Sequence, residues 1–230
     1  MSLVIATPFR GSNPWCAQVT IGYAENVRAL CQEMPGTEVI PEVVTYACEQ
    51  VRARNRVAAI ILRDFPKMTH ILWWDDDQWP AERKIVAEMM ATGEDLICAP
   101  YTNKKPPIRW VHQLLYPCPV GANGIQHVRS VGFGFTMTSR ACLERMSASA
   151  RKYTDERSGV TANIFGQLYD APTPGCPEES EVLLSEDYSF CKRWRSLGGH
   201  VSLYLNAGII YHAGMYPWSA QDMPGGIVPG

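Results

Sequence analysis

The sequence predicts a single α/β domain with a mostly parallel central sheet that becomes mixed in its C-terminal half. Three observations predict this fold class. Apolar strand-like runs alternate with helical segments through the first hundred residues, which is typical of a parallel sheet with crossover helices. One of these runs, His70–Trp74, is apolar or aromatic without helical spacing and leads straight into three aspartates. After Pro100, strand-like segments follow one another through Pro/Gly-rich connections.

Strands and helices follow in order through the first half. Asn13 and Pro14 are typical of a helix start. Pro41 interrupts the second strand and favours a place near a sheet edge. Pro80 suits the first turn of a helix, because its missing N–H costs nothing there. We expect strands at Ser2–Ala6, Thr37–Val44, His70–Trp74 and Asp95–Ala99, and helices at Asn13–Cys31, Tyr46–Arg63 and Ala81–Thr92.

Shorter elements are expected to complete the sheet. Ser139 and Ser185 are suited to cap helices. Residues 147–184 are rich in Ser, Pro, Gly and charge, which is typical of a functional loop or lid. We expect strands at Ile108–Leu115, Gln126–Val131, His200–Tyr204 and Gly208–His212, a flexible turn at Gly132-Phe133-Gly134, helices from Ser139 to Met146 and from Ser185 to Leu197, and a Pro/Gly-rich tail over 217–230.

Composition narrows the class of protein. The 230 residues, 46% of them hydrophobic, are enough for one large domain or two small ones. A net charge of −2 argues weakly against a broad nucleic-acid-binding surface. We expect neither a membrane span nor a signal peptide. The eight cysteines include no Cys-x-x-Cys pair and fit reduced, mostly buried thiols of a cytoplasmic protein.

Asp75, Asp76 and Asp77 lie where an interior strand emerges. Three adjacent carboxylates repel one another and are stabilised by a cation among them. Hard oxygen ligands suit Mg²⁺ or Mn²⁺, and α/β proteins place ligands at this edge of the sheet. The sequence therefore favours a divalent-metal site. The alternative is an acidic turn whose charges complement the dipole of the next helix.

Helical periodicity places Arg54 and Asn55 on the inward face of their helix, with Arg52 and Arg56 pointing away. Inward polar side chains need partners. The candidate partners of Arg54 and Asn55 are the aspartate cluster and a bound phosphate or base. The alternative for Arg54 is an ion pair with an aspartate that has only a structural role.

Two further positions suggest chemistry. Glu186 and Asp187 occupy the first turn of a helix, where they either compensate its dipole or serve as a general base. His212 ends a late apolar strand, where it either completes a metal site or is structural. The sequence contains no Ser-centred nucleophile elbow and no Walker-type phosphate loop.

Together, over about residues 2–214, these motifs resemble nucleotide-sugar glycosyltransferases of the GT-A fold, most closely the inverting, family-2-like type. Their order and spacing in one chain are more specific than any single motif. The motifs are Ile5-Ala6-Thr7-Pro8, Arg54-Asn55, Asp75-Asp76-Asp77, Val131-Gly132-Phe133-Gly134-Phe135, Leu184-Ser185-Glu186-Asp187 with Arg193-Trp194 and Gly198, and Tyr211-His212. The resemblance implies one Rossmann-like GT-A domain over 1–216, with a nucleotide-binding half at 1–100 and an acceptor and donor-sugar half at 101–216.

The resemblance also implies transfer of one sugar from a nucleotide sugar, with UDP- or GDP-sugars as expected donors, to a hydroxyl of a glycan. It implies inversion at the anomeric carbon. Mn²⁺ or Mg²⁺ would be held by Asp75, Asp77 and His212. The donor would contact Thr7, Pro8, Arg10, Arg54, Asn55, Asp75, Asp76, Gly132, Phe133 and Gly134. Asp187, beside Glu186, would be the general base.

One motif departs from the family, and other functions stay open. Where processive synthases have Gln-x-x-Arg-Trp, this chain has Phe190-Cys191-Lys192-Arg193-Trp194. Together with the expected lack of membrane spans, this difference favours single-sugar transfer by a soluble enzyme. A nucleotidyltransferase would usually show a Gly-rich loop after the first strand, where only Gly11 is found. A non-catalytic nucleotide- or metal-binding module is a third possibility. A basic patch keeps a modified DNA base open as acceptor; its residues are Lys104, Lys105, Arg109, Arg151 and Lys152.

Overall fold

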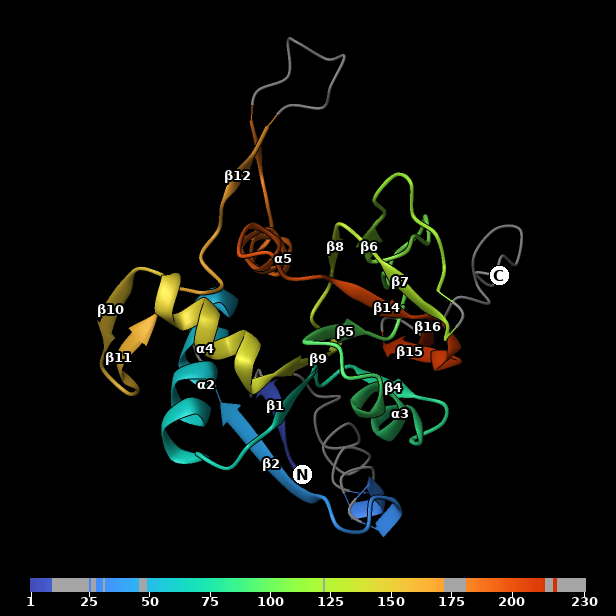
Figure 1. Cartoon of the computed structure of the whole chain (residues 1–230), viewed down its shortest axis with the longest axis horizontal. Coiled ribbons are helices and arrows are strands. Elements are labelled where there is room, and N and C mark those ends of the chain that lie inside the picture. The colour runs from blue at the N-terminus through green and yellow to red at the C-terminus, as the bar shows by residue number, and fades with distance from the viewer. Residues whose placement is uncertain are drawn as a thin grey trace.

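The computed structural model describes residues 1–9, 25, 28–30, 32–45, 49–121, 123–171, 181–213 and 217–218 (Figure 1). A seven-stranded sheet forms its centre. The strands of this sheet are β1 (Ser2–Phe9), β2 (Glu38–Thr45), β3 (His70–Trp74), β5 (Leu96–Cys98), β7 (Ile125–His127), β9 (Phe135–Ser139) and β14 (Ser202–Tyr204).

The order of the strands is β2-β1-β3-β9-β5-β14-β7. β1 pairs in parallel with β2 and β3, and β5 pairs in parallel with β14. β9 is antiparallel to both β3 and β5, and β7 is antiparallel to β14. Five of the seven strands therefore point the same way, and the exceptions come from the C-terminal half. The predicted α/β fold with a mostly parallel sheet is confirmed, and β2, which contains Pro41, lies at the sheet edge as predicted.

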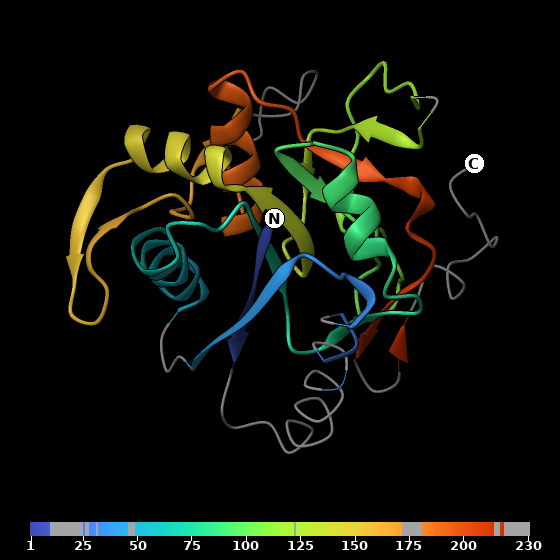
Figure 2. The ribbon, with the colours of Figure 1, turned by 60° about the horizontal axis from the view of Figure 1, so that its bottom comes forward.

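Helices cover both faces of this sheet (Figures 1 and 2). α2 (Gln50–Asp64), α4 (Arg140–Ser149) and α5 (Glu186–Ser196) lie on one face, and α3 (Ile85–Ala91) lies on the other. The caps predicted for α4 and α5 are confirmed: the hydroxyls of Ser139 and Ser185 accept hydrogen bonds from the backbone N–H groups of Cys142 (3.0 Å) and Tyr188 (3.3 Å). Among the described residues, no helix has the length and apolarity needed to cross a membrane.

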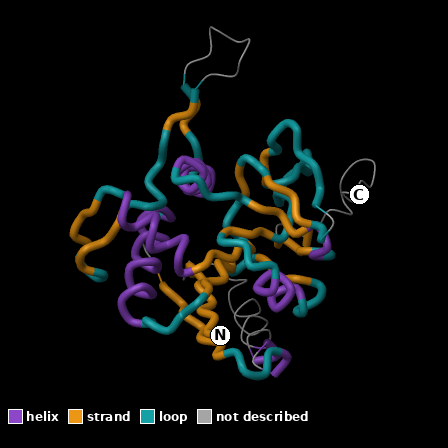
Figure 3. Tube along the Cα trace, in the orientation of Figure 1, coloured by secondary structure: helices purple, strands orange, loops and turns teal. Residues whose placement is uncertain are grey.

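Short strands and long connections surround the central sheet (Figure 3). A 3₁₀-helix, η1, spans Leu205–Ala207. The ribbon formed by β12 (Tyr169–Asp170) and β13 (Val182–Leu183) extends away from the body beside α5 in Figure 1. The small sheets pair β4 (Gln78–Pro80) with β15 (Ile210–Ala213) and β15 with β16 (Pro217–Trp218), β6 (His112–Gln113) with β8 (Ser130–Val131), β10 (Lys152–Asp155) with β11 (Gly159–Ala162), and β12 (Tyr169–Asp170) with β13 (Val182–Leu183).

Aromatic side chains fill the space between the sheet and the α2–α5 face. Phe133 lies at the centre of this group, with its ring centroid 5.9 Å from Trp73, 5.2 Å from Phe165 and 4.8 Å from Phe190. All four side chains are fully buried. Since aromatic rings bury large apolar areas, this aromatic cluster fixes the end of β3, the turn before β9 and the start of α5 against one another.

Several expected elements were wrong in detail. Pro80 belongs to β4 and pairs with Ile210, so it does not open a helix, and α3 begins only at Ile85. Only His112–Gln113 of the strand expected at Ile108–Leu115 is a strand, and the strand expected at Gln126–Val131 is divided into β7 and β8. β9, at the middle of the sheet, was not predicted. The turn before β9 is packed rather than flexible, since Phe133 is fully buried.

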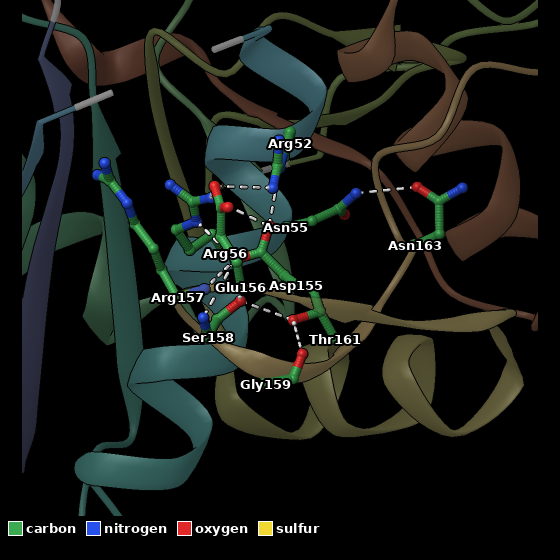
Figure 4. A network of polar contacts seen from close by, with 10 residues as sticks. All are labelled: Arg52, Asn55, Arg56, Asp155, Glu156, Arg157, Ser158, Gly159, Thr161 and Asn163. Carbon is green, nitrogen blue, oxygen red and sulfur yellow. Dashed lines mark hydrogen bonds and ion pairs between the residues drawn. The ribbon is translucent and has the colours of Figure 1, made fainter. Parts of the chain in front are cut away.

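The outward orientation predicted for Arg56 was also wrong (Figure 4). Arg56 is buried and donates two hydrogen bonds, of 2.9 and 3.0 Å, to the carboxylate of Asp155 in β10. Arg52 donates a third, of 2.8 Å, to the same carboxylate. The β10–β11 hairpin is thus fastened to α2, although it lies within the segment 147–184 that was expected to be a loop or lid.

Candidate active site

Arg54 connects two elements that are far apart in the chain. Its side chain is 1% exposed, on the inward face of α2 as the helical period predicts. One Nη donates to the backbone oxygen of Phe133 at 3.2 Å, and the other donates to the carboxylate of Asp75 at 3.3 Å. Its Nε lies 3.6 Å from Oδ1 of Asp187. Its guanidinium carbon lies 5.7 Å above the ring of Phe133, so Arg54 is held by both charge and aromatic contact.

Asp187 occupies the first turn of α5, where the helix dipole favours an anion. Its Oδ2 accepts a hydrogen bond of 3.0 Å from the backbone N–H of Phe133. Its Oδ1 is buried and accepts no hydrogen bond from the described residues. Burial raises the pKa of Asp187 to about 7 against the opposing effect of Arg54. Oδ1 is therefore an acceptor on a carboxylate whose pKa lies near neutrality, as a general base requires.

Asp77 and His212 meet where β4 pairs with β15. The Nε2 of His212 lies 3.6 Å from Oδ1 of Asp77, and Oδ2 of Asp77 forms an ion pair with Lys104. The Nδ1 of His212 donates to the carbonyl oxygen of Thr102 at 2.7 Å, because a carbonyl can only accept. In the neutral ring, Nε2 then keeps its lone pair and faces a carboxylate oxygen. Two acceptors that face each other at this distance are suited to a shared cation, and metal-bound histidines commonly donate their other ring N–H to a carbonyl.

The Gly132-Phe133-Gly134 turn links these groups. The backbone of Phe133 holds both Asp187 and Arg54. The carbonyl of the next residue, Gly134, accepts a hydrogen bond of 2.8 Å from the N–H of Asp75. A Cβ on Gly134 would lie 1.9 Å from the side-chain amide of Gln78, so a larger residue there would require that amide to move. The turn therefore fixes Asp75 and Asp187 relative to each other. We refer to Arg54, Asp75, Asp77, Asp187 and His212 as the carboxylate cluster.

The region around this cluster has an excess of negative charge. Five carboxyl groups, those of Asp75, Asp76, Asp77, Glu186 and Asp187, accompany the cations of Arg54 and Lys104, so the formal charge is −3. Burial, together with Asp77 and Asp76, raises the pKa of Asp75 to about 6 despite Arg54.

Asp77 behaves differently. Burial acts to raise its pKa, but the contacts of Lys104 and of His212 in its protonated form hold it below the usual value. Within the described part of the chain, no three His, Cys, Asp or Glu side chains are arranged as a ready-made metal site. The donor set and charge of the Asp77–His212 pair nevertheless fit a divalent cation that replaces Lys104.

Other predicted site residues are placed as follows. The Asn55 amide faces away from the carboxylates and bonds Asn163 and the N–H of Phe165, both at 2.9 Å. The buried hydroxyl of Thr7, in β1, has no hydrogen-bond partner among the described residues. Glu186 and Asp76 are partly exposed. Only the backbone of Pro8 is described, and Arg10 and most of the helix expected at Asn13–Cys31 lie outside the described residues.

Two residues of the site were not anticipated in these roles. Lys104 was expected only as part of a basic patch, yet it pairs with Asp77. Tyr101, whose hydroxyl accepts a hydrogen bond of 3.0 Å from the N–H of Gly134, was not singled out at all. No sequence signal marks either, because both contacts span long separations along the chain. Arg151 and Lys152 lie at β10, on the opposite side of the molecule from β4 and β15 where Lys104 binds, so the expected basic patch is not continuous (Figures 1 and 2).

Comparison with known proteins gives similarity in structure alone. A scan against family models and a search of curated proteins both find no match. Among solved structures, A197 from STIV aligns with a TM-score of 0.53 and 13% identity over 93% of this chain and 86% of that chain. The catalytic domain of Drosophila β1,4-galactosyltransferase 7, solved with xylobiose, aligns with a TM-score of 0.46 and 14% identity over 89% of this chain and 65% of that chain. The chain thus shares the α/β fold of A197.

Proposed function

We propose that this protein is a glycosyltransferase that moves one sugar from a nucleotide sugar to a hydroxyl acceptor, with inversion and with Asp187 as general base. One observation carries the proposal: Arg54 joins Asp75, at the carboxyl end of β3, to Asp187, at the start of α5. Arg54 therefore contacts both the motif that resembles a GT-A donor site and the aspartate that resembles its catalytic base. Asp77 and His212 form the adjoining acceptor pair for a cation.

The chemistry follows from the charges of these groups. Oδ1 of Asp187, which accepts no hydrogen bond from the described residues, would take the proton of an attacking hydroxyl, while the N–H of Phe133 keeps the carboxylate in place through Oδ2. Arg54 offsets part of the repulsion between Asp75 and Asp187. Asp77 and His212 would hold Mn²⁺ or Mg²⁺, which supplies positive charge to a diphosphate leaving group. Asp75 and Asp76 would face the ribose of a UDP- or GDP-sugar.

Substitution of the two neighbouring acids tests the assignment of the base. Asp187→Asn should lower the rate of transfer by about 10²–10⁴-fold, since that is the usual contribution of a positioned base. Glu186→Gln is the matched control and should keep most of the activity. The assay follows nucleoside diphosphate released from UDP- and GDP-sugars with Mn²⁺ and a panel of glycans, and NMR of the product reports inversion. Turnover that is unchanged in Asp187→Asn would remove the assigned base.

Metal binding is tested separately from activity. Titration calorimetry with Mn²⁺ should show at least about tenfold weaker binding for Asp77→Asn, because the cation loses a carboxylate ligand. Asp64→Asn, which removes a carboxylate whose side chain is 44% exposed at the end of α2, is the matched control. Equal affinities in both variants would contradict the assignment of Asp77 as a ligand.

A further inference from the structure

A pocket lies beside α5, and its lining shares no residue with the carboxylate cluster. Its volume is about 500 Å³, within the range of roughly 300–1,000 Å³ that is typical of small-molecule sites. It lies between one side of α5 and the β6–β8 region, which are neighbours in Figure 1, and the turn after α5 closes one end. We call it the α5 pocket.

Positive charge dominates the lining of the α5 pocket. Arg129, Lys192 and Arg195 line it, and Asp170 is the one carboxylate among the lining residues, so the formal charge is +2 with neutral histidines. Asp170 is shared: it pairs with Arg129, and it accepts a hydrogen bond of 3.0 Å from Lys192. Arg195 makes no ion pair with any residue that the structure describes, and its guanidinium donates a hydrogen bond of 3.4 Å to the backbone oxygen of Arg129. A cation without a carboxylate partner beside a pocket favours an anionic ligand.

The α5 pocket and the candidate base are built on the same elements. Tyr188 lines the pocket and directly follows Asp187, and Ser130 lines it three residues before Phe133, whose N–H holds Asp187. Along α5, eight residues separate Asp187 from Arg195, which corresponds to about 12 Å at 1.5 Å per residue. A ligand that reaches both groups therefore extends along the helix, with its reacting hydroxyl at one end and its negative charge at the other.

We propose that the α5 pocket binds the negatively charged group of an acidic sugar, so that the acceptor of the transfer carries a carboxylate, sulfate or phosphate. The role as acceptor subsite rests on the proposed function, whereas the binding of an acidic sugar does not. Arg195 provides the uncompensated charge, and Lys192 and Arg129 contribute the remainder. Tyr188 and Ser130 also line the pocket, and the hydroxyl of Ser130 donates a hydrogen bond of 2.8 Å to Oε1 of Gln113.

Binding of matched sugars to the purified protein tests the proposal without a donor. Titration calorimetry at low ionic strength compares methyl glucuronide with methyl glucoside, which differ in the carboxylate, and glucose 6-sulfate with inorganic sulfate, which lacks the sugar. The acidic sugars should bind at least about tenfold more tightly than methyl glucoside, and Arg195→Gln should weaken them about tenfold. Lys67→Gln, which removes an exposed cation just after α2, is the matched control and should leave binding unchanged.

Three results would overturn the proposal: equal affinity for the glucuronide and the glucoside, equal effects of Arg195→Gln and Lys67→Gln, or inorganic sulfate bound as tightly as the sugar sulfate. The last would show that the sugar contributes nothing. Thermal unfolding of each variant shows that the fold is retained, and Lys192→Gln provides a second test on the same pocket. Failure of transfer in every donor assay, with Arg195-dependent binding intact, would count against the proposed function and not against the pocket.

Discussion

The buried carboxylate of Asp155 holds the β10–β11 hairpin on α2, and its charge can be removed with little change in size (Figure 4). The Asp155 side chain is fully buried. Besides its three hydrogen bonds from Arg56 and Arg52, it accepts backbone N–H groups from Arg157 at 2.9 Å and Ser158 at 3.1 Å. Asp155→Asn keeps the shape of this network and leaves the arginines with only the exposed carboxylate of Glu156 as counter-charge.

The size of the effect follows from the burial of each partner. The side chain of Arg56 is 5% exposed, so its charge cannot be hydrated when Asp155 is neutral. Loss of one partner of a buried ion pair costs about 3–5 kcal/mol. Arg52 is 43% exposed and adds less than about 1 kcal/mol. Since asparagine can still accept some of the hydrogen bonds, we expect Asp155→Asn to lower the free energy of unfolding by about 3 kcal/mol.

Urea denaturation followed by tryptophan fluorescence at pH 7 measures this difference. Glu156→Gln is the matched control, because its side chain is 71% exposed and its ion pair with Arg52 at 3.3 Å contributes at most about 1 kcal/mol. The hydrogen bonds from Arg56 hold the pKa of Asp155 far below its usual value. The stability that this carboxylate provides is therefore present above its unfolded pKa of about 3.9 and is lost as the pH falls further.

The difference between the wild type and Asp155→Asn should accordingly narrow below about pH 4. A cost for Asp155→Asn no greater than that for Glu156→Gln would refute the reasoning, as would a difference that persists unchanged in acid.

Three further predictions use the same logic. The rate of the proposed transfer should rise with pH through about 7 and then level off, because the pKa of Asp187 is raised to about 7 and only the ionised carboxylate accepts a proton; a kcat profile that is flat from pH 6 to 8 would count against this base. Gly132→Ala should lower the free energy of unfolding, measured by chemical denaturation, by about 1–3 kcal/mol, because the new Cβ would lie 2.2 Å from the Tyr101 hydroxyl. An unchanged denaturation midpoint would show that the side chains around Gly132 can move to accommodate the methyl group. Cys98 and Cys142 should resist iodoacetamide until the protein unfolds, because burial raises both thiol pKa values, that of Cys98 to about 12; mass spectrometry that finds rapid native labelling would contradict their burial.

Features encoded locally were the ones that sequence reasoning predicted well. β3 begins and ends where its unbroken apolar run does, because a strand that is buried on both faces must be apolar at every position. Ser185 caps α5 as expected, because the cap depends only on residues within one turn. Arg54 points inward because its place in the helical period is set by its apolar neighbours.

Features set by distant partners were missed. β9 has the sequence Phe-Thr-Met-Thr-Ser, and its polar threonines interrupt the apolar run expected of a strand at the centre of the sheet. They are tolerated there because Thr136 donates to the carbonyl of Gly132 at 2.7 Å and Thr138 accepts from Trp73 Nε1 at 3.0 Å. Arg56 likewise points to Asp155, ninety-nine residues later in the chain. Neither pairing leaves a local pattern, because the partner becomes a neighbour only in the folded chain.

The position of β9 determines how the molecule can be divided. It comes from the second half of the chain, yet it lies between β3 and β5, which both come from the first half. A fragment that stops near residue 100 would leave these two strands with open inner edges, and exposed edges of this kind invite aggregation. Expression of the two halves as separate polypeptides should therefore yield soluble protein only when both are present together, so the boundary expected near residue 100 does not separate independently folding units.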